Sequence, residues 1–217
     1  MDLDSLILLL KTQTIHVKRR REFKDENEKF PPLMFAFSIA PCGDYPVVPI
    51  SGVQNSTKRR KYSELWELLT SCWTKCDYES FLMWKGYTSN IGVCIHSSTH
   101  RLLESLVDGD EIKIDDYDVY CGSMQYGKAV SAPMREEWMF WKSREFCDEN
   151  EFRFYFDFKN DGDKDSSSKD IPIIPHVLIK KVTLTPFING EASKELALLL
   201  QKEYDINVEP SKIQYKK

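Results

Sequence analysis

The first apolar residues of the chain follow the spacing of a helix. Leu3, Leu6, Ile7 and Leu10 recur at intervals that place one apolar stripe on a short helix. The same spacing predicts further helices over residues 63–72, 79–87, 99–107 and 191–204. In the last of these helices we expect three leucines to face inward, namely Leu196, Leu199 and Leu200.

Other segments alternate apolar and polar residues, as half-buried strands do. Ile15 and Val17 alternate with His16 and Lys18, which predicts a strand near the N-terminus. The remaining predicted strands lie within residues 33–39, 92–97, 112–124, 149–158 and 177–185.

Helices and strands in this irregular order favour an α+β fold over a regular βαβ winding. We predict a single domain over residues 1–217, with a mixed, mostly antiparallel sheet and several short flanking helices. Residues 160–170 are polar and rich in serine, which predicts a mobile surface loop within that domain. A chain of 217 residues is long enough to bury a sizeable core.

Composition narrows the class of protein. The net charge of -4 argues against broad nucleic-acid binding. No apolar run approaches the ~20 residues of a membrane span, and the longest run is preceded by acidic residues, whereas a secretory signal begins with basic ones. The six cysteines form no CxxC pair, so we expect them to be reduced and buried. These observations predict a cytoplasmic protein.

The strongest candidate for chemistry lies on the predicted strand at 149–158. On a strand, Glu149, Glu151 and Arg153 share one face, and the phenylalanines of the opposite face form core. Two carboxylates about 7 Å apart could divide acid and base work, bind a metal, or hold a ribose while the arginine clamps a phosphate. The alternative is a solvated polar face in which Arg153 pairs with Glu151.

Two other segments carry weaker signals. On a helix over residues 79–87, Tyr87 lies on the same side as Glu79, so a carboxylate and a ring could face one cleft. The alternative is that the aromatic residues there are core. The run from Lys18 to Arg21 suggests a phosphate contact, or a surface loop neutralised by the acidic residues that follow it.

Short catalytic signatures are absent. The sequence has no GxxxxGK[ST], GxGxxG, HExxH or GxSxG, which argues against the commonest nucleotide and serine hydrolases. Its four histidines have no spacing typical of a metal site. His96 could line a pocket, although a histidine with satisfied hydrogen bonds is the simpler interpretation.

Taken together, these segments resemble the bacterial domain-of-unknown-function family numbered 2971. The residues that carry the resemblance are Phe23, Asp25, Glu28, Cys72-Trp73, Glu79-Ser80, Met83-Trp84, Tyr87, Gly92-Val93, Lys142, Phe146, Glu149, Glu151, Arg153 and the segment 182–186. The chain departs from the family pattern at Lys24, where an asparagine is usual, and it has no proline after Asp25. The resemblance implies a functional Glu-x-Glu-x-Arg face but names no reaction.

The first functional hypothesis is an NAD-dependent transferase or hydrolase similar to the ADP-ribosyltransferases, which place a Glu-x-Glu strand beside a cleft that holds NAD. The similarity implies that Glu151 stabilises the developing oxocarbenium ion and that Glu149 positions the acceptor. Arg153 or Lys142 would meet the pyrophosphate.

In the same hypothesis, Tyr87 or Trp84 would stack on a ring of the substrate. Glu79 and Asp25 complete the residues that we expect to bind it.

Two alternatives stay open. One is a metal-dependent nuclease, with Asp25, Glu28, Glu149 and Glu151 as Mg²⁺ ligands and Lys142 as a charge stabiliser. The other is a non-catalytic binding module of a bacterial defence or toxin system, in which the Glu/Arg face is an interface or a structural ion-pair ladder.

Overall fold

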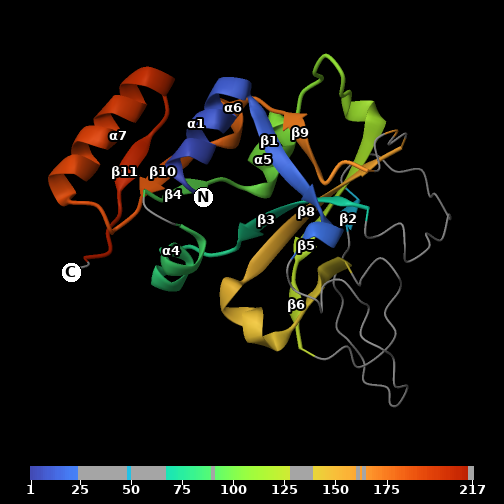
Figure 1. Ribbon diagram of the computed structural model, residues 1–217, viewed down its shortest axis with the longest axis horizontal. Helices are drawn as coiled ribbons and strands as arrows, with labels where there is room; N and C mark the ends of the chain where they lie inside the picture. The colour runs from blue at the N-terminus through green and yellow to red at the C-terminus, as the bar shows by residue number, and fades with distance from the viewer. Residues whose placement is uncertain are drawn as a thin grey trace. The chain divides into compact units, whose positions relative to one another are not determined.

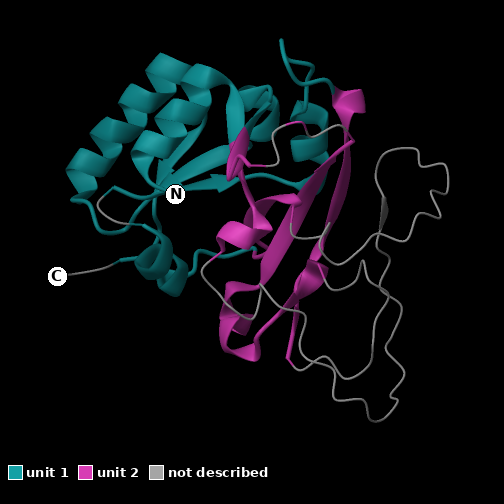
Figure 2. Ribbon diagram, turned by 45° about the vertical axis from the view of Figure 1, so that its right-hand side comes forward, with its two compact units in different colours: residues 1–15, 77–113, 170–217 teal, residues 16–76, 114–169 magenta. Residues whose placement is uncertain are grey.

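The computed structural model describes residues 1–23, 48–49, 67–88, 91–127, 139–159, 162 and 165–214. The chain is α+β and its strands are mostly antiparallel, as the sequence predicts. It divides into two compact units, each assembled from separate segments (Figure 2). Unit 1 comprises residues 1–15, 77–113 and 170–217, and unit 2 comprises residues 16–76 and 114–169. That the two units form one domain stays a prediction.

Unit 1 combines helices with a three-stranded sheet in the order β11–β10–β4 (Figure 1). Its strands are β4 (Val93–His96), β10 (Lys181–Leu184) and β11 (Val208–Pro210). Its helices are α1 (Leu3–Thr12), α4 (Phe81–Tyr87), α5 (Thr99–Ser105), α6 (Pro175–Leu178) and α7 (Gly190–Tyr204). Strands β10 and β11 are parallel, and α7 provides the crossover that a parallel pair requires.

The sheet of unit 1 has one apolar and one polar face. Val93, Val182, Leu184 and Val208 are almost fully buried and supply the apolar face. The intervening residues of the same strands point the other way because side chains alternate along a strand. They are Cys94 and His96 on β4, Lys181 and Thr183 on β10, and Glu209 on β11.

Unit 2 is built on a six-stranded sheet in the order β2–β5–β8–β3–β1–β9. These strands are β1 (Thr14–Arg19), β2 (Val48–Pro49), β3 (Leu69–Thr74), β5 (Tyr117–Ser123), β8 (Glu151–Phe158) and β9 (Ser168–Pro172). The chain passes between the two units four times, and two of these passages lie within β1 and β9. A two-stranded sheet joins β6 (Gln125–Tyr126) to β7 (Trp141–Lys142), and short 3-10 helices are η1 (Arg20–Glu22), η2 (Ile114–Asp116) and η4 (Arg144–Glu149).

Strand β8 lies inside this sheet, between β5 and β3. Arg153 is opposite Cys72 on one neighbour and Gly122 on the other. Gly122 is required there because a Cβ atom would lie 2.9 Å from the ring of Phe140. Phe140 belongs to a core cluster with Leu68, Met124, Met139 and Tyr155. Both faces of β8 are therefore largely buried.

Two predicted elements differ from the structure. A helix was expected over residues 63–72, but residues 69–74 form β3, and residues 63–66 lie outside the described residues. Apolar spacing alone cannot distinguish a short buried strand from a helix. Residues 69–74 form a strand because they pair with β8 along their whole length. The strand expected over 177–185 begins only at Lys181, because Pro175 starts the short helix α6.

Three smaller expectations also change. Leu199 of α7 is 65% exposed, whereas Leu200 is buried as expected. Cys72, Cys76 and Cys147 are exposed, so only part of the cysteine prediction holds. Residues 168–170 belong to β9 and not to a loop, while residues 160, 161, 163 and 164 lie outside the described part of the chain, as do residues 33–39.

Candidate functional site

The predicted Glu/Arg face is a buried ion-pair network in unit 2. Lys142 Nζ donates to Glu149 Oε2 at 2.6 Å and to Glu151 Oε2 at 3.0 Å. Arg153 donates through Nε to Glu151 Oε1 at 2.7 Å and through Nη2 to Oε2 at 2.9 Å. This bidentate geometry is the strongest form of arginine–carboxylate pairing. We refer to Lys142, Glu149, Glu151 and Arg153 as the ion-pair network.

Solvent access is uneven across the ion-pair network. The side chain of Arg153 is 1% exposed, and those of Glu151 and Lys142 are 7% and 8% exposed. Glu149 is the most accessible member, at 16%. The alternative of a solvated polar face is therefore wrong about exposure, because β8 has neighbours on both edges and its side chains are largely buried. Its pairing of Arg153 with Glu151 is confirmed. The opposite face is core as predicted, with Phe154 and Phe156 almost fully buried.

Local backbone geometry brings the two glutamates together. Glu149 is the last residue of η4, and Asn150 adopts the left-handed conformation with φ 42° and ψ 51°. Strand β8 begins after it, at Glu151. The prediction that both glutamates lie on one strand is thus wrong. They are neighbours because Lys142, at the end of β7, bridges them.

Aromatic groups enclose the cations of the network. The Arg153 guanidinium lies 5.1 Å from the centre of the Phe23 ring, and Lys142 Nζ lies 4.6 Å from that of Phe146. Both geometries are favourable cation–π contacts. The Tyr126 hydroxyl accepts a hydrogen bond from the Glu151 amide at 2.6 Å. The network is therefore held by backbone and ring contacts as well as by charge.

The ionisation of Glu151 reflects two opposing effects. Burial alone raises the pKa of its carboxyl group, because the charged form loses hydration. Hydrogen bonding and charge from Arg153, with smaller contributions from Cys72 and Lys142, more than offset burial and hold the pKa below its usual value. Glu151 is thus a buried carboxylate that stays ionised at neutral pH.

The other predicted site residues fall in unit 1 or outside the described residues. Glu79, Trp84 and Tyr87 belong to unit 1. Trp84 is 4% exposed, so its ring is packed in the core and is not offered to a ligand, whereas Tyr87 is 54% exposed. Asp25 and Glu28 lie outside the described residues. The structure therefore gathers four of the eight predicted residues into one cluster.

A second candidate, which sequence reasoning largely missed, is a hollow of about 340 Å³ in unit 1. Its floor is the polar face of the three-stranded sheet, with His96, Lys181, Thr183 and Glu209. Its walls are residues 77–79 together with Pro210, Lys212 and Ile213. The sequence signals two of its residues, His96 by alternation and Glu79 as an expected binding residue, but it does not bring them together, because the other floor residues come from strands far along the chain.

Hydrogen bonds organise the hollow. His96 Nε2 lies 2.8 Å from Thr183 Oγ1, and Lys181 Nζ lies 3.0 Å from Glu209 Oε2. The Glu79 carboxylate joins the two walls, since it accepts from the Ser211 hydroxyl and from the Lys212 amide. Burial, together with the charge of Lys181, lowers the pKa of His96 below its usual value, so its ring is neutral at pH 7.

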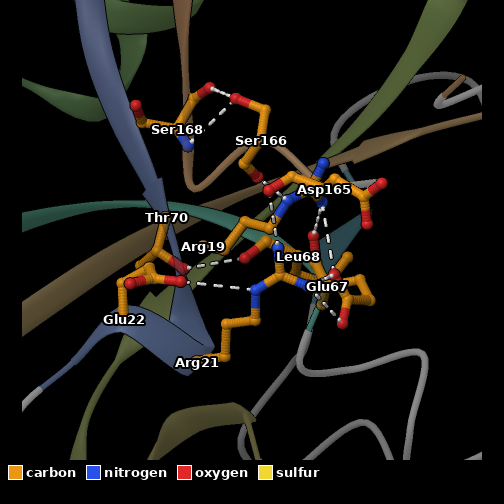
Figure 3. Close-up of polar contacts among 9 residues, drawn as sticks. All are labelled: Arg19, Arg21, Glu22, Glu67, Leu68, Thr70, Asp165, Ser166 and Ser168. Carbon is orange, nitrogen blue, oxygen red and sulfur yellow. Dashed lines mark hydrogen bonds and ion pairs between the residues drawn. The ribbon is translucent and has the colours of Figure 1, made fainter. Parts of the chain in front are cut away.

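The basic run near the N-terminus is structural. Arg19 is fully buried and donates to the backbone oxygens of Glu67 and Ser166. Arg21 donates to both carboxylate oxygens of Glu67, at 2.9 and 3.1 Å (Figure 3). The prediction of a surface loop is therefore wrong for Arg19 and Arg21. These arginines connect the end of β1 and the residues after it to neighbouring segments of unit 2.

No family model, curated protein or solved structure matches this chain. The resemblance to family 2971 stays a prediction. Within the described residues, no helix is long and apolar enough to cross a membrane. The same residues contain no group of three or more His, Cys, Asp or Glu side chains that could hold a metal ion.

Proposed function

We propose that the chain cleaves the ribosyl bond of NAD or a related nucleotide, by transfer or hydrolysis, with Glu149 of the ion-pair network as the catalytic carboxylate and Glu151 as the residue that positions it. The observation that carries the proposal is a buried, ionised Glu151 coupled through Lys142 to a more accessible Glu149. Fixed carboxylates in a partly dehydrated site stabilise positive charge better than water does.

In this reaction the bond between the ribose anomeric carbon and the leaving base breaks. The base leaves with the electron pair, and positive charge develops on the ribose. A water or an acceptor hydroxyl then forms the new bond to that carbon, and its proton passes to a carboxylate. One accessible carboxylate can supply both the charge stabilisation and the base, provided that neighbouring groups hold it in place.

The geometry favours Glu149 over Glu151 as the group that meets the substrate. Both oxygens of Glu151 are engaged by Arg153, and the side chain is less exposed than that of Glu149. Glu151 then acts as a positioning residue that fixes Lys142 against Glu149. Arg153 is too deeply buried for the pyrophosphate contact expected from the sequence, and Trp84 is too deeply buried for ring stacking.

The first test is Glu149→Gln, with nicotinamide release from NAD measured by chromatography. We expect kcat to fall by about 10²-fold or more, the size typical of a lost general base. The matched control is Glu145→Gln, an exposed glutamate of the same 3-10 helix, which should leave kcat unchanged. Equal rates for wild type and Glu149→Gln would contradict the assignment.

A second candidate is a non-catalytic module in which the network is a structural ion-pair ladder. The observation that favours it is the pairing of both Glu151 oxygens with Arg153. If wild type releases no nicotinamide from NAD across a panel of protein and nucleic-acid acceptors, this candidate replaces the transferase. The nuclease hypothesis gains no support, because two of its four ligands lie outside the described residues.

A further inference from the structure

The hollow of unit 1 is suited to a ligand by its size and its lining. At about 340 Å³ it falls within the range of small-molecule sites, ~300–1,000 Å³. The floor is formed by regular strands, so the polar groups on it are held in place. No residue of the ion-pair network lines it.

The charges on the floor are already paired. Lys181 and Glu209 form one pair at 3.0 Å. A cationic ligand would compete with Lys181 for Glu209, and an anionic ligand would compete with Glu209 for Lys181. Either ligand would weaken the existing pair, which reduces the net gain from binding.

A neutral hydroxyl group avoids this conflict. It donates one hydrogen bond and accepts others, so two adjacent hydroxyls can accept from Lys181 while donating to Glu209 without separating them. The neutral imidazole of His96 and the Thr183 hydroxyl offer a second donor–acceptor pair on the same floor. The floor therefore presents two neighbouring pairs of donors and acceptors.

The rim adds apolar surface. Tyr78 is 71% exposed and Ile213 is half-buried, and both line the hollow. An exposed tyrosine ring provides flat apolar area with a polar tip. Such a surface suits the C–H face of a sugar ring, whose hydroxyl edge can meet the floor.

We infer that this hollow binds a neutral polyhydroxylated ligand through a vicinal diol, either a free sugar or the ribose of a nucleoside. The Lys181–Glu209 pair is the main contact for the diol, with His96 and Thr183 beside it. Every residue that carries this inference belongs to unit 1, and none of them has a role in the proposed transferase reaction.

The test is an NMR titration that follows the imidazole signals of His96, assigned with His96→Asn. The probes are ribose, glucose, adenosine and 2′-deoxyadenosine, with acetate and ethylammonium as charged comparators. We expect saturable shifts with adenosine and with at least one free sugar. Binding of 2′-deoxyadenosine should be at least ~10-fold weaker than that of adenosine, because a site built to bond a hydroxyl rejects the analogue that lacks it. Ribose against adenosine distinguishes the free sugar from the nucleoside.

The decisive variant is Lys181→Gln, which should weaken diol binding at least tenfold. Lys194→Gln is the matched control, an exposed lysine of α7 that does not line the hollow. Glu209→Gln provides a second variant with the same expected loss. Tighter binding of acetate or ethylammonium than of any diol would overturn the inference, as would the absence of saturation with every diol. The titration measures binding and not turnover. An absence of nicotinamide release would therefore contradict the proposed transferase reaction without affecting the inference about the hollow.

Discussion

Two lysine–glutamate pairs in this chain have the same N–O distance and different surroundings. Lys142–Glu151 in unit 2 and Lys181–Glu209 in unit 1 both measure 3.0 Å. The first pair is 8% and 7% exposed, and the second is 30% and 43% exposed. Distance alone therefore says little about what each pair does, because the surroundings set both the strength of the pair and its availability.

The buried pair is part of a larger set of contacts. Glu151 has a second cation, Arg153, which satisfies both of its oxygens. Removal of one member leaves a buried charge without compensation, which is costly in a region of low dielectric. The exposed pair is screened by water and contributes little to folding. Its accessible groups are correspondingly free to exchange water for a ligand.

The largest expected effect is that of Glu151→Ala on stability. Loss of one partner of a buried ion pair costs about 3–5 kcal/mol, so the urea midpoint should fall sharply. Joint replacement of Glu151 and Arg153 by Met and Leu should recover most of this loss, because no charge is then left unpaired. A loss below about 1 kcal/mol for Glu151→Ala is typical of surface pairs. Such a result would mean that water hydrates the cations that lose Glu151 as their partner.

The next effect concerns pH, and it separates the two regions. The pKa of Glu151 is lowered from 4.5 in the folded chain. Its contribution to the free energy of unfolding is therefore complete above pH 4.5 and is lost as the pH falls through the lower pKa of the folded state. The pKa of His96 is lowered from 6.5, so the unfolded chain binds a proton there more readily than the folded chain. The stability that the neutral ring contributes is therefore complete above pH 6.5 and is lost as the pH falls below it. Urea midpoints measured from pH 8 to pH 3 should fall in both windows.

Matched variants assign the two windows. Glu151→Gln should remove the dependence below pH 4.5 and His96→Asn the dependence that begins near pH 6.5. If either variant alters the other window, the two regions are coupled and the assignment is wrong.

The smallest effect is expected for Lys181→Gln. Since the pair with Glu209 is screened by solvent, the melting temperature should stay close to that of wild type at low and at high salt. Lys142→Gln, measured by the same thermal melt, should lower it clearly. Equal losses for the two variants would show that exposure does not separate the pairs.

The sequence predicts the residues of the network better than their environment. Glu149, Glu151 and Arg153 stand out by spacing, and family resemblance adds Lys142. Their burial depends on β8 lying between β3 and β5, which is a matter of long-range pairing. The same limit explains the helix expected over 63–72, because local apolar spacing does not reveal that β3 pairs with β8.

The hollow shows the complementary limit. Alternation along 93–96 places His96 on the polar face correctly. Lys181 and Glu209 come from distant strands, and only the register of β4, β10 and β11 brings them beside it. Elements with strong local signals, such as α1 and α7, are predicted within a residue or two of their bounds.

The interleaving of the two units has a consequence for how the protein is made. On the ribosome, all strands of the six-stranded sheet exist once residue 172 has been synthesised. Strand β4, by contrast, is made early, and the strand that it pairs with among the described residues, β10, follows only at residues 181–184. The three-stranded sheet of unit 1 is therefore completed later than the six-stranded sheet, when β11 is made at residues 208–210.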